Sequence, residues 1–290
     1  MLEHKLKKNL KPKRVIILGK NSFIGKELIR FLKLHEINFK AFGKKDIDLE
    51  KENSYKKLSK NLKEDDCLIL ISAKVPVKNI GMFKQNLSII DSMIKAINIV
   101  PVQHVINISS DAVYEDILKP MNENSKKSPN SLHGLMHLTR ETLLKENVER
   151  KRLAILCPTL IYGKNDPHDG YGPNKFYRLI KKNKDIILFG KGEERRDHVF
   201  VEDVAKIILY VILRKSYGSL NIATGILKSF NDCAQLLKKI YKKDINIIFT
   251  KRVGEMPHNG YRAFNIKHTK SLFPGFQYTK PVDGFKKFKE

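Results

Sequence analysis

The segment RVIILGKNSFIGKELIRFL, residues 14–32, has the pattern of a buried strand, a tight turn and a helix. Gly19 and Gly25 bound the turn, and Ser22 stands between them. A helix that begins at the carboxyl end of a strand points unpaired backbone N–H groups and its positive dipole end at any anion there. The turn therefore predicts a site for a nucleotide diphosphate, although an ordinary strand-to-helix turn that binds nothing has the same outline.

A second feature that could take part in a chemical reaction is the pair His133 and His137, which lie four residues apart in a helical pattern. This spacing puts both imidazoles on one helix face. Imidazole titrates near neutral pH, so such a residue can move protons without a neighbouring cation. The same spacing suits a shared zinc or nickel ion, with Asp166, His168 or Asp169 as a third ligand. No motif supports that third ligand, and we expect no metal.

The elements that position these residues alternate along the first half of the chain. Apolar strand-like runs occupy 14–19, 38–43, 67–72, 103–109 and 152–157. Helical patterns occupy 23–34, 53–62, 80–99 and 131–147. This alternation predicts an α/β protein, with a doubly wound parallel sheet that has helices on both faces.

The pattern changes after Pro158. The polar loop GKNDPHDGYGPN, 163–174, is long enough to shape a ligand site. Strands at 186–190, 219–223 and 246–250 and helices at 201–214 and 229–241 follow, and we expect the helix at 201–214 and the strand near 220 to return to the main sheet. The expected division is a mobile basic tail at 1–13, a main domain at 14–162 and 199–225, and a smaller lobe at 163–198 and 226–290.

Composition sets limits on location and partners. The chain has 56 Lys and Arg against 31 Asp and Glu, a formal charge of +25. Such a charge suggests nucleic acid or an anionic membrane surface. The lysines are spread over the whole chain, however, so a compositional bias explains them and no specific nucleic-acid partner is expected. No apolar run is long enough to cross a bilayer and no signal peptide is visible, which predicts a cytoplasmic protein without a transmembrane segment. Cys67, Cys157 and Cys233 are expected to be reduced core residues.

Eight features in order resemble the extended short-chain dehydrogenase/reductase family, which contains nucleotide-sugar epimerases, dehydratases and reductases. They are GKNSFIG at 19–25, DCLILISA at 66–73, Asn86, INISSDAVY at 106–114, HGLMHLTRE at 133–141, CPTLIYG at 157–163, RRDHVFVEDVA at 195–205 and NIATG at 221–225. The resemblance covers essentially the whole chain beyond residue 13. It implies a Rossmann-type sheet with a smaller C-terminal substrate lobe, an NAD(P) cofactor, a nucleotide-sugar substrate, and a homodimer formed through 80–99 and 131–147.

The resemblance also implies a set of cofactor-binding residues. These are Gly19, Asn21, Ser22, Phe23, Ile24, Gly25, Lys44, Lys45, Asp48, Leu49, Ser72, Ala73, Lys74, His137 and Pro158. NADP is favoured over NAD because the second strand ends in Gly43, Lys44 and Lys45, with no carboxylate before Asp46, and a 2′-phosphate needs cations. NAD remains the alternative, since lysine is common throughout the chain. Asp48 and Leu49 match the pair that reaches the adenine in the dehydrorhamnose reductase and GDP-fucose synthase branches.

The catalytic positions depart from the family pattern. In the family a Ser or Thr polarises the substrate oxygen, a Tyr moves the proton, and a Lys four residues later binds the nicotinamide ribose and lowers the Tyr pKa. Ser110 matches the first role, and Asp111 stands beside it. His133 and His137 replace the Tyr and Lys. We hypothesise that His133 is the proton donor and acceptor and that His137 bonds the ribose. The alternatives are a non-catalytic cleft and the metal site.

Substrate-binding candidates lie in the second half of the chain. Arg196 matches the arginine that holds the nucleotide diphosphate in the family, and Arg262 occupies a similar late position. The planar guanidinium fork suits phosphate oxygens, although both residues could also be solvated surface arginines. Asn174 and Lys175 are candidates for binding sugar or phosphate, with loop capping as the alternative. Asp203 is expected to be a structural cap or an ion-pair partner.

Together these features predict an NAD(P)(H)-dependent enzyme that reduces or epimerises a nucleotide-activated sugar for surface polysaccharide synthesis. Ala112 stands where a dehydratase usually has a Glu, which argues against dehydration. A non-catalytic NADP(H)-binding module that has lost the Tyr and Lys is the main alternative, and nucleic-acid binding is a third.

Overall fold

The computed structural model describes residues 1–167 and 170–289. The chain divides into two compact units. Unit 1 contains residues 1–115, 123–158 and 204–222, and unit 2 contains residues 116–122, 159–203 and 223–290.

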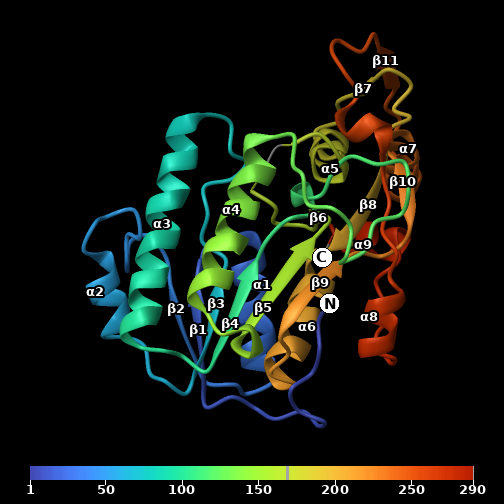
Figure 1. Ribbon diagram of the computed structural model, residues 1–290. Helices are drawn as coiled ribbons and strands as arrows, with labels where there is room; N and C mark the ends of the chain where they lie inside the picture. The colour runs from blue at the N-terminus through green and yellow to red at the C-terminus, as the bar shows by residue number, and fades with distance from the viewer. Residues whose placement is uncertain (168–169, 290) are drawn as a thin grey trace. The chain divides into compact units, whose positions relative to one another are not determined.

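Unit 1 is built on a parallel sheet of six strands in the order β2-β1-β3-β4-β5-β9 (Figure 1). The strands are β1 (Arg14–Leu18), β2 (Phe39–Phe42), β3 (Asp66–Leu70), β4 (His104–Ile108), β5 (Leu153–Pro158) and β9 (Gly218–Ile222). Every residue of β3, β4 and β5 is buried, as expected for a parallel sheet covered on both faces. The strand order reverses between β1 and β3, where doubly wound sheets bind ligands at their carboxyl ends.

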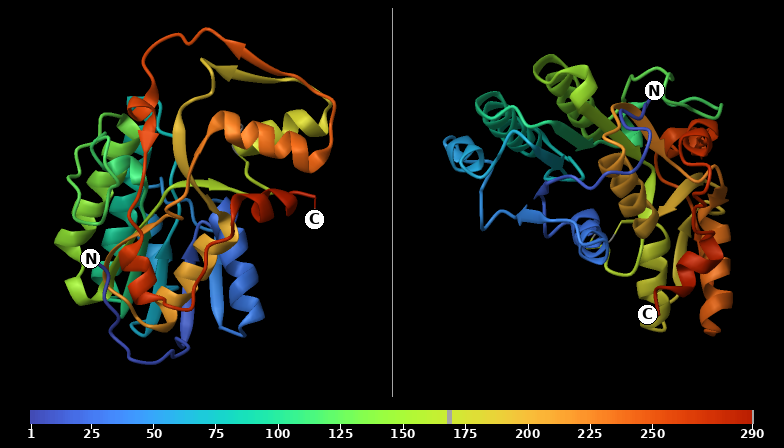
Figure 2. Two further views of the ribbon diagram at one scale, coloured as in Figure 1. Left: turned by 90° about the vertical axis from the view of Figure 1, so that its right-hand side faces the viewer. Right: turned by 90° about the horizontal axis from the view of Figure 1, so that it is seen from below.

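Helices cover both faces of this sheet (Figures 1 and 2). One face carries α3 (Ile80–Ile99) and α4 (Leu132–Asn147), with α2 (Ser54–Ser59) packed beside α3. The other face carries α1 (Phe23–Leu34) and α6 (Val201–Leu213). Two short 3-10 helices, η1 (Asp111–Val113) and η2 (Arg150–Arg152), flank α4 in sequence. The predicted α/β class with a doubly wound parallel sheet is confirmed.

Unit 2 contains a small mixed sheet and short helices. Strand β8 (Arg195–Phe200) pairs with β6 (Leu160–Tyr162), β10 (Leu227–Ser229) and β12 (Tyr261–Arg262), and β7 (Ile186–Phe189) pairs with β11 (Ile247–Thr250). The helices are α5 (Pro173–Lys181), α7 (Phe230–Tyr241), η3 (Pro257–Gly260), α8 (Lys267–Leu272) and α9 (Pro281–Lys286). Its core includes Tyr162, whose ring packs against Phe200, Phe285 and Phe288. Asp203 accepts two hydrogen bonds from Thr279, so it has the predicted structural role.

The first thirteen residues differ from the expected mobile tail. Glu3 forms an antiparallel bridge with Tyr217, and Leu6 and Leu10 donate backbone hydrogen bonds to the end of α6. Leu2 is fully buried. The prediction of a mobile tail is wrong because these backbone hydrogen bonds and the burial of Leu2 dock the segment onto unit 1, whereas its composition alone resembles a solvated tail.

Most element boundaries agree with the sequence prediction to within two residues, but the helix expected at 53–62 ends at Ser59. Asn61 and Leu62 donate instead to Leu58 and Ser59, which tightens the last turn into i→i+3 geometry. All three cysteines are buried and free, as expected. Within the described part of the chain, no helix has the length and apolar character needed to cross a membrane.

A buried ion pair links β1 to β3. The Asp66 carboxylate is fully buried and accepts two hydrogen bonds from Arg14, at 2.8 and 2.7 Å, and one from the Lys63 backbone N–H at 2.7 Å. Asp66→Ala would leave the Lys63 backbone N–H without this acceptor and the guanidinium with the Asn61 carbonyl in place of a carboxylate, so we expect the free energy of unfolding to fall by about 3 kcal/mol. Urea denaturation measures the change.

Asp65→Ala is the matched control, because the Asp65 side chain is 40% exposed and its carboxylate forms a surface ion pair with Lys13. We expect this variant to keep nearly the wild-type unfolding midpoint. Equal losses in the two variants would contradict a special role for the buried pair.

Candidate active site

The turn between β1 and α1 is closed by the side chain of Ser22. Its hydroxyl donates to the Gly19 carbonyl at 2.7 Å and accepts from the Gly25 N–H at 3.0 Å. Ser22 is thus the N-cap of α1. The hydroxymethyl group, which interrupts the glycine pattern in the sequence, is part of the turn itself.

Gly19 and Gly25 allow close approach at this turn. Gly19 has a φ of 112°, and a Cβ there would lie 3.0 Å from the Ser72 backbone nitrogen. A Cβ on Gly25 would overlap the Gly19 carbonyl. The turn is therefore packed directly against the end of β3. Ile24 is buried in the core, so only its backbone faces the turn, while Asn21 is exposed and Phe23 half-buried.

Cationic side chains lie at the ends of β2 and β3. Lys44 Nζ lies 2.9 Å and Lys74 Nζ 3.4 Å from the same Glu50 oxygen. The hydrogen bond from Lys44 is the largest cause that lowers the pKa of Glu50, so this carboxylate is ionised. Lys45 is exposed, Asp48 half-buried and Leu49 buried. The arrangement brings two of the three predicted lysines together.

The segment that leaves β3 is held by two buried side chains. Asn86 on α3 accepts from the Lys74 N–H and donates to its carbonyl. Arg140 on α4 donates to the carbonyls of Leu70 and Ser72, both at 2.8 Å. The predicted residues Ser72, Ala73 and Lys74 thus have a fixed backbone. Pro158 is buried at the end of β5, paired with Ile222.

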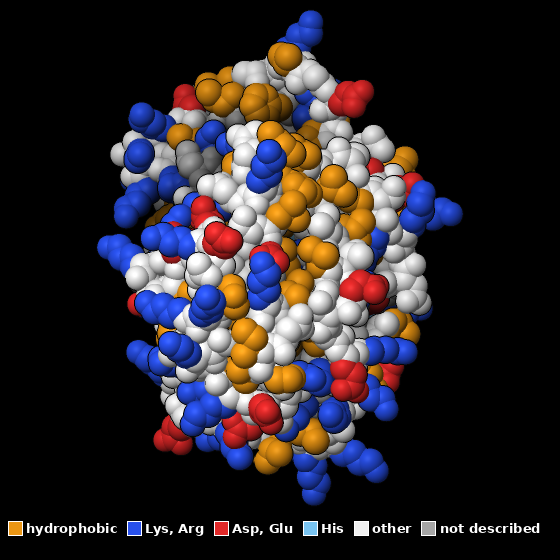
Figure 3. Space-filling model, turned by 60° about the vertical axis from the view of Figure 1, so that its left-hand side comes forward, with side chains coloured by type: hydrophobic (Ala, Val, Ile, Leu, Met, Phe, Trp, Pro, Cys, Tyr) orange, Lys and Arg blue, Asp and Glu red, His pale blue; other side chains and the backbone are white. Residues whose placement is uncertain are grey.

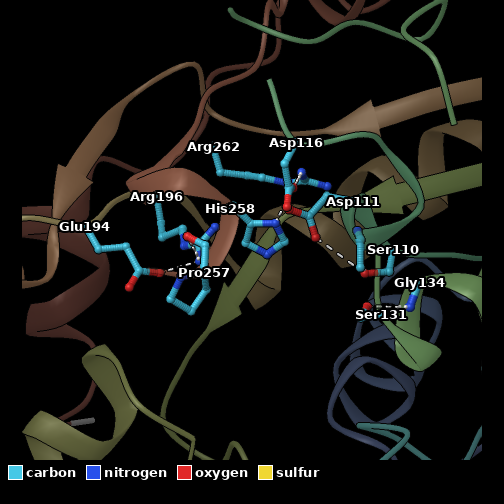
Figure 4. A network of polar contacts seen from close by, with 11 residues as sticks. Ser110, Asp111, Asp116, Ser131, Gly134, Glu194, Arg196, Pro257, His258 and Arg262 are labelled. Carbon is cyan, nitrogen blue, oxygen red and sulfur yellow. Dashed lines mark hydrogen bonds and ion pairs between the residues drawn. The ribbon is translucent and has the colours of Figure 1, made fainter. Parts of the chain in front are cut away.

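Ser110 and Asp111 lie just beyond the end of β4 (Figure 4). Ser110 caps η1 by accepting from the Ala112 N–H at 3.2 Å, and its hydroxyl lies 3.4 Å from Asp111 Oδ1. Ser131 caps α4 through Gly134, and a Cβ on Gly134 would overlap the Ala112 carbonyl. The first turn of α4, which carries His133, therefore rests on η1.

His133 and His137 pack edge to face, with ring centroids 4.8 Å apart. His133 is half-buried, whereas His137 is only 5% exposed and its Nδ1 has no hydrogen-bond partner in the described structure. Burial, followed by His133 and Arg140, lowers the pKa of His137 well below 6.5. This imidazole is therefore neutral at pH 7.

A buried ionic cluster lies behind the same helix. Glu141 on α4 is fully buried and accepts a 2.5 Å hydrogen bond from Ser109, the residue before Ser110. Lys127 also bonds Glu141, and Cys157 Sγ lies 3.7 Å from it. These contacts fasten α4 to the ends of β4 and β5.

No group of three potential metal ligands occurs among the residues that the structure describes. The Asp166 carboxylate accepts from Asn174 Nδ2 at 2.6 Å. The other two candidate ligands, His168 and Asp169, lie outside the described residues.

In unit 2, Arg196 and Arg262 are direct cross-strand neighbours on β8 and β12. They are 6% and 1% exposed, so neither is a solvated surface residue. Arg196 pairs with buried Glu194, and Arg262 Nη1 lies 2.6 Å from Asp116 (Figure 4). Like charges on adjacent positions of a sheet repel, and the two carboxylates compensate for that repulsion.

The turn of η3 joins these two ion pairs. Arg196 donates to the Pro257 carbonyl at 3.3 Å, and the next residue, His258, bonds Asp116 at 2.5 Å. Arg252 lies 3.7 Å from Glu194. Among the described residues, these contacts bring three guanidinium groups to two carboxylates.

Asn174 closes the polar loop. Its side chain accepts from the Gly163 N–H at 3.1 Å in addition to binding Asp166. This is the loop-capping arrangement that the sequence left open. Lys175 is half-buried on α5.

Sequence reasoning missed several residues of these sites. They are Arg140, Glu141, Lys127, Glu194, Asp116 and His258. The spacing of Arg140 and Glu141 from His137 puts them near the histidine face of α4, and this was a usable signal. No sequence signal pointed to Asp116, because its partner Arg262 is 146 residues away.

The chain belongs to the NAD dependent epimerase/dehydratase family, whose sequence profile matches residues 15–223. It is 33% identical over 171 residues to a putative UDP-glucose 4-epimerase of Methanocaldococcus jannaschii, a match that covers 57% of this chain and 54% of the relative. It is 25% identical over 195 residues to mouse dTDP-D-glucose 4,6-dehydratase, covering 64% and 54%. The matches thus span little more than half the length of these relatives.

Solved structures share the fold over nearly the whole chain. A GDP-L-fucose synthetase from Naegleria fowleri bound to NADP superposes with a TM-score of 0.83 at 18% identity, covering 97% of this chain and 94% of that one. A UDP-glucose 4-epimerase from Thermotoga maritima with UDP-glucose gives 0.81 at 20% identity, covering 95% and 97%.

Three buried histidines make stability depend on pH. Burial lowers the pKa of His104 and His198 to about 4 and that of His137 well below 6.5, so the unfolded chain binds these protons first as pH falls. Asp197 opposes the trend, because burial raises its pKa to about 6. With three protons favouring unfolding and one favouring folding, we expect a loss of about 2–3 kcal/mol per pH unit near pH 5.5.

Urea midpoints between pH 7 and 5 measure this slope. His137→Asn should lower the number of protons taken up on unfolding by about one, and the slope should fall accordingly. A pH-independent midpoint in the wild type would contradict the neutral, buried state of these imidazoles.

Proposed function

We propose that the protein is an NADP(H)-dependent oxidoreductase or epimerase that acts on a nucleotide-activated sugar, by keto-sugar reduction or epimerisation, in surface polysaccharide synthesis. The observation that carries the proposal is the histidine pair on the first turns of α4, which rests on the segment that Ser110 caps. Family membership and the bound ligands of the structural neighbours support it.

The residues present fit a dinucleotide. The capped turn at Gly19–Gly25 offers backbone N–H groups and a helix dipole to the pyrophosphate. Lys44 and Lys74, which already share Glu50, would accept a 2′-phosphate, and this favours NADP over NAD. When bound, the nicotinamide would accept or donate the hydride.

Proton transfer falls to the residues at the end of β4 and the start of α4. The Ser110 hydroxyl would hydrogen-bond the sugar oxygen, and the imidazole of His133 would take its proton or return it. His137, buried below His133, would bond the cofactor ribose. An imidazole can do this work near neutral pH without the lysine that a phenol requires.

Arg196 and Arg262 would bind the diphosphate of the substrate. Their adjacent positions on β8 and β12 and their burial support this role. A diphosphate would take over charge compensation from Glu194 and Asp116. Asn174 and Lys175 are weaker candidates, since Asn174 already closes its own loop.

We also propose that two copies associate through α3 and α4. Large apolar side chains are exposed on both helices, namely Ile80, Leu87, Ile99, Leu132 and Leu135. On the face shown in Figure 3, hydrophobic side chains form a band between Lys and Arg side chains. A second copy would remove such a band from water.

His133→Phe tests the proposed chemistry. Removing the imidazole should lower hydride transfer by about 100-fold or more, the usual scale for a general acid or base, while NADPH affinity stays nearly unchanged. Turnover would be measured with UDP-, dTDP- and GDP-linked sugars and their 4-keto forms, and NADPH affinity by calorimetry.

The double variant His133→Tyr, His137→Lys is the matched control, because it restores the family's usual pair and should recover part of the rate. Wild-type turnover in His133→Phe would rule out His133 as the acid or base. NADPH binding by the wild type without turnover of any sugar would favour the non-catalytic module.

Arg196→Met tests the diphosphate site. Loss of a charged hydrogen-bonding partner should raise the Kd of UDP, dTDP or GDP by about 10- to 100-fold. Arg252→Met is the control, because Arg252 contacts the same Glu194 but lies farther away, at 3.7 Å. Calorimetry with both variants should separate them, and equal affinities for the diphosphates would contradict the assignment.

A further inference from the structure

Arg140 is a buried cation without a carboxylate partner. Its side chain is on α4, three residues after His137, and the residue is 2% exposed. Its hydrogen bonds go to two backbone carbonyls, those of Leu70 and Ser72, and its Nε has no partner. Among the described residues it forms no ion pair. Burial lowers the pKa of Arg140 to about 10, so it still carries its charge at neutral pH.

A buried charge without an ionic partner is costly, and among the described residues two carbonyl dipoles are the hydrogen-bond partners of Arg140. A methionine or leucine would fill similar space, and a neutral amide would still bond a carbonyl. What only a cation supplies is a fixed positive potential, and the imidazole of His137, three residues earlier on the same helix, lies within its reach. The charge acts on the side chains proposed to move the proton.

We propose that Arg140 is a positioning residue of the reaction, which fixes the backbone at 70–72 and keeps a permanent positive charge one helical turn from His137. The inference rests on the proposed function for its catalytic meaning. A neutral imidazole accepts a proton, so a fixed charge that disfavours a further cation on this helix face prepares the site to start from a sugar hydroxyl. His133 would then take the hydroxyl proton, and a bound oxidised nicotinamide would supply the acceptor for the hydride on the same carbon, which would leave a carbonyl. Both are returned in the second half of an epimerisation.

Burial is the first cause of the lowered pKa of His137, and His133 and Arg140 add to it. On the elements that pack against α4, the other chargeable groups are paired or exposed: Lys84, Asp91 and Lys95 on α3, Asp111 on η1, and Cys157 on β5. Glu141 on α4 itself is bound to Ser109 and Lys127.

The test is a set of three substitutions at one position. Arg140→Gln removes the charge and keeps an amide donor, Arg140→Met removes both, and Arg140→Lys keeps the charge. The readout is the pH titration of histidine ring carbons by NMR between pH 3 and 8 without cofactor, with His133→Gln and His137→Gln used for assignment. A unit charge about one helical turn away predicts that Gln and Met raise the midpoint of the pair by about one pH unit, and that Lys leaves it near the wild-type value.

His104 and His198 are internal controls, because they are buried on β4 and β8 and should not respond to any of the three changes. If Arg140 had a purely structural role, its substitution would also shift the midpoints of these controls, or Arg140→Lys would shift the midpoints of the pair as much as Arg140→Met does. Unchanged midpoints of the pair in Arg140→Gln would overturn the inference; if that variant does not fold, Arg140→Met serves instead. A shift in Arg140→Lys as large as in the Gln or Met variant would also overturn it.

A second measurement separates this inference from the proposed function. If the enzyme turns over a nucleotide sugar, the acidic limb of its pH–rate profile should move up by the same unit in Arg140→Gln. If the NMR midpoints move as expected but the wild type turns over no sugar, the charge effect stands and the enzymatic proposal fails.

Discussion

The docking of α4 onto the ends of β3 and β4 is the interaction on which the candidate site depends. Arg140 bonds the carbonyls at the end of β3, and its neighbour Glu141 accepts from Ser109 at the end of β4. Gly134 allows the first turn of the helix to touch η1. These buried polar contacts have strict geometry, so they determine both the height and the rotation of the helix. The positions of His133 and His137 relative to Ser110 follow from them.

The cations proposed to bind phosphate are paired with carboxylates before any ligand is present. Glu50 holds Lys44 and Lys74, Glu194 holds Arg196, and Asp116 holds Arg262. Such pairs keep cations in place at positions where an incoming phosphate can replace the carboxylate as partner. Arg140 is the exception among these cations in the described structure, since carbonyl dipoles are its partners. The first group of cations can exchange a carboxylate partner for a phosphate, whereas Arg140 keeps the same carbonyl partners throughout.

The sheet was predictable because local patterns and topology agree. Ser22 and Asn79 cap α1 and α3, so these helices begin where the sequence indicates. The alternation of strands and helices then determines a parallel sheet. The docking of residues 1–13 and the pairing of Asp116 with Arg262 were not predictable, because both depend on partners far away in the chain. The neutral state of His137 depends on burial, which a single sequence does not report.

The most direct test of the account is a titration of NADPH, and separately of NADH, into the histidine-labelled protein, followed by the ring carbon signals of His133 and His137. The account predicts that these two residues shift with a saturable dependence on nucleotide concentration, more tightly for NADPH, while buried His104 and His198 stay unchanged. If neither nucleotide causes a saturable shift of the pair, α4 does not present its imidazoles to a bound dinucleotide and the account is contradicted.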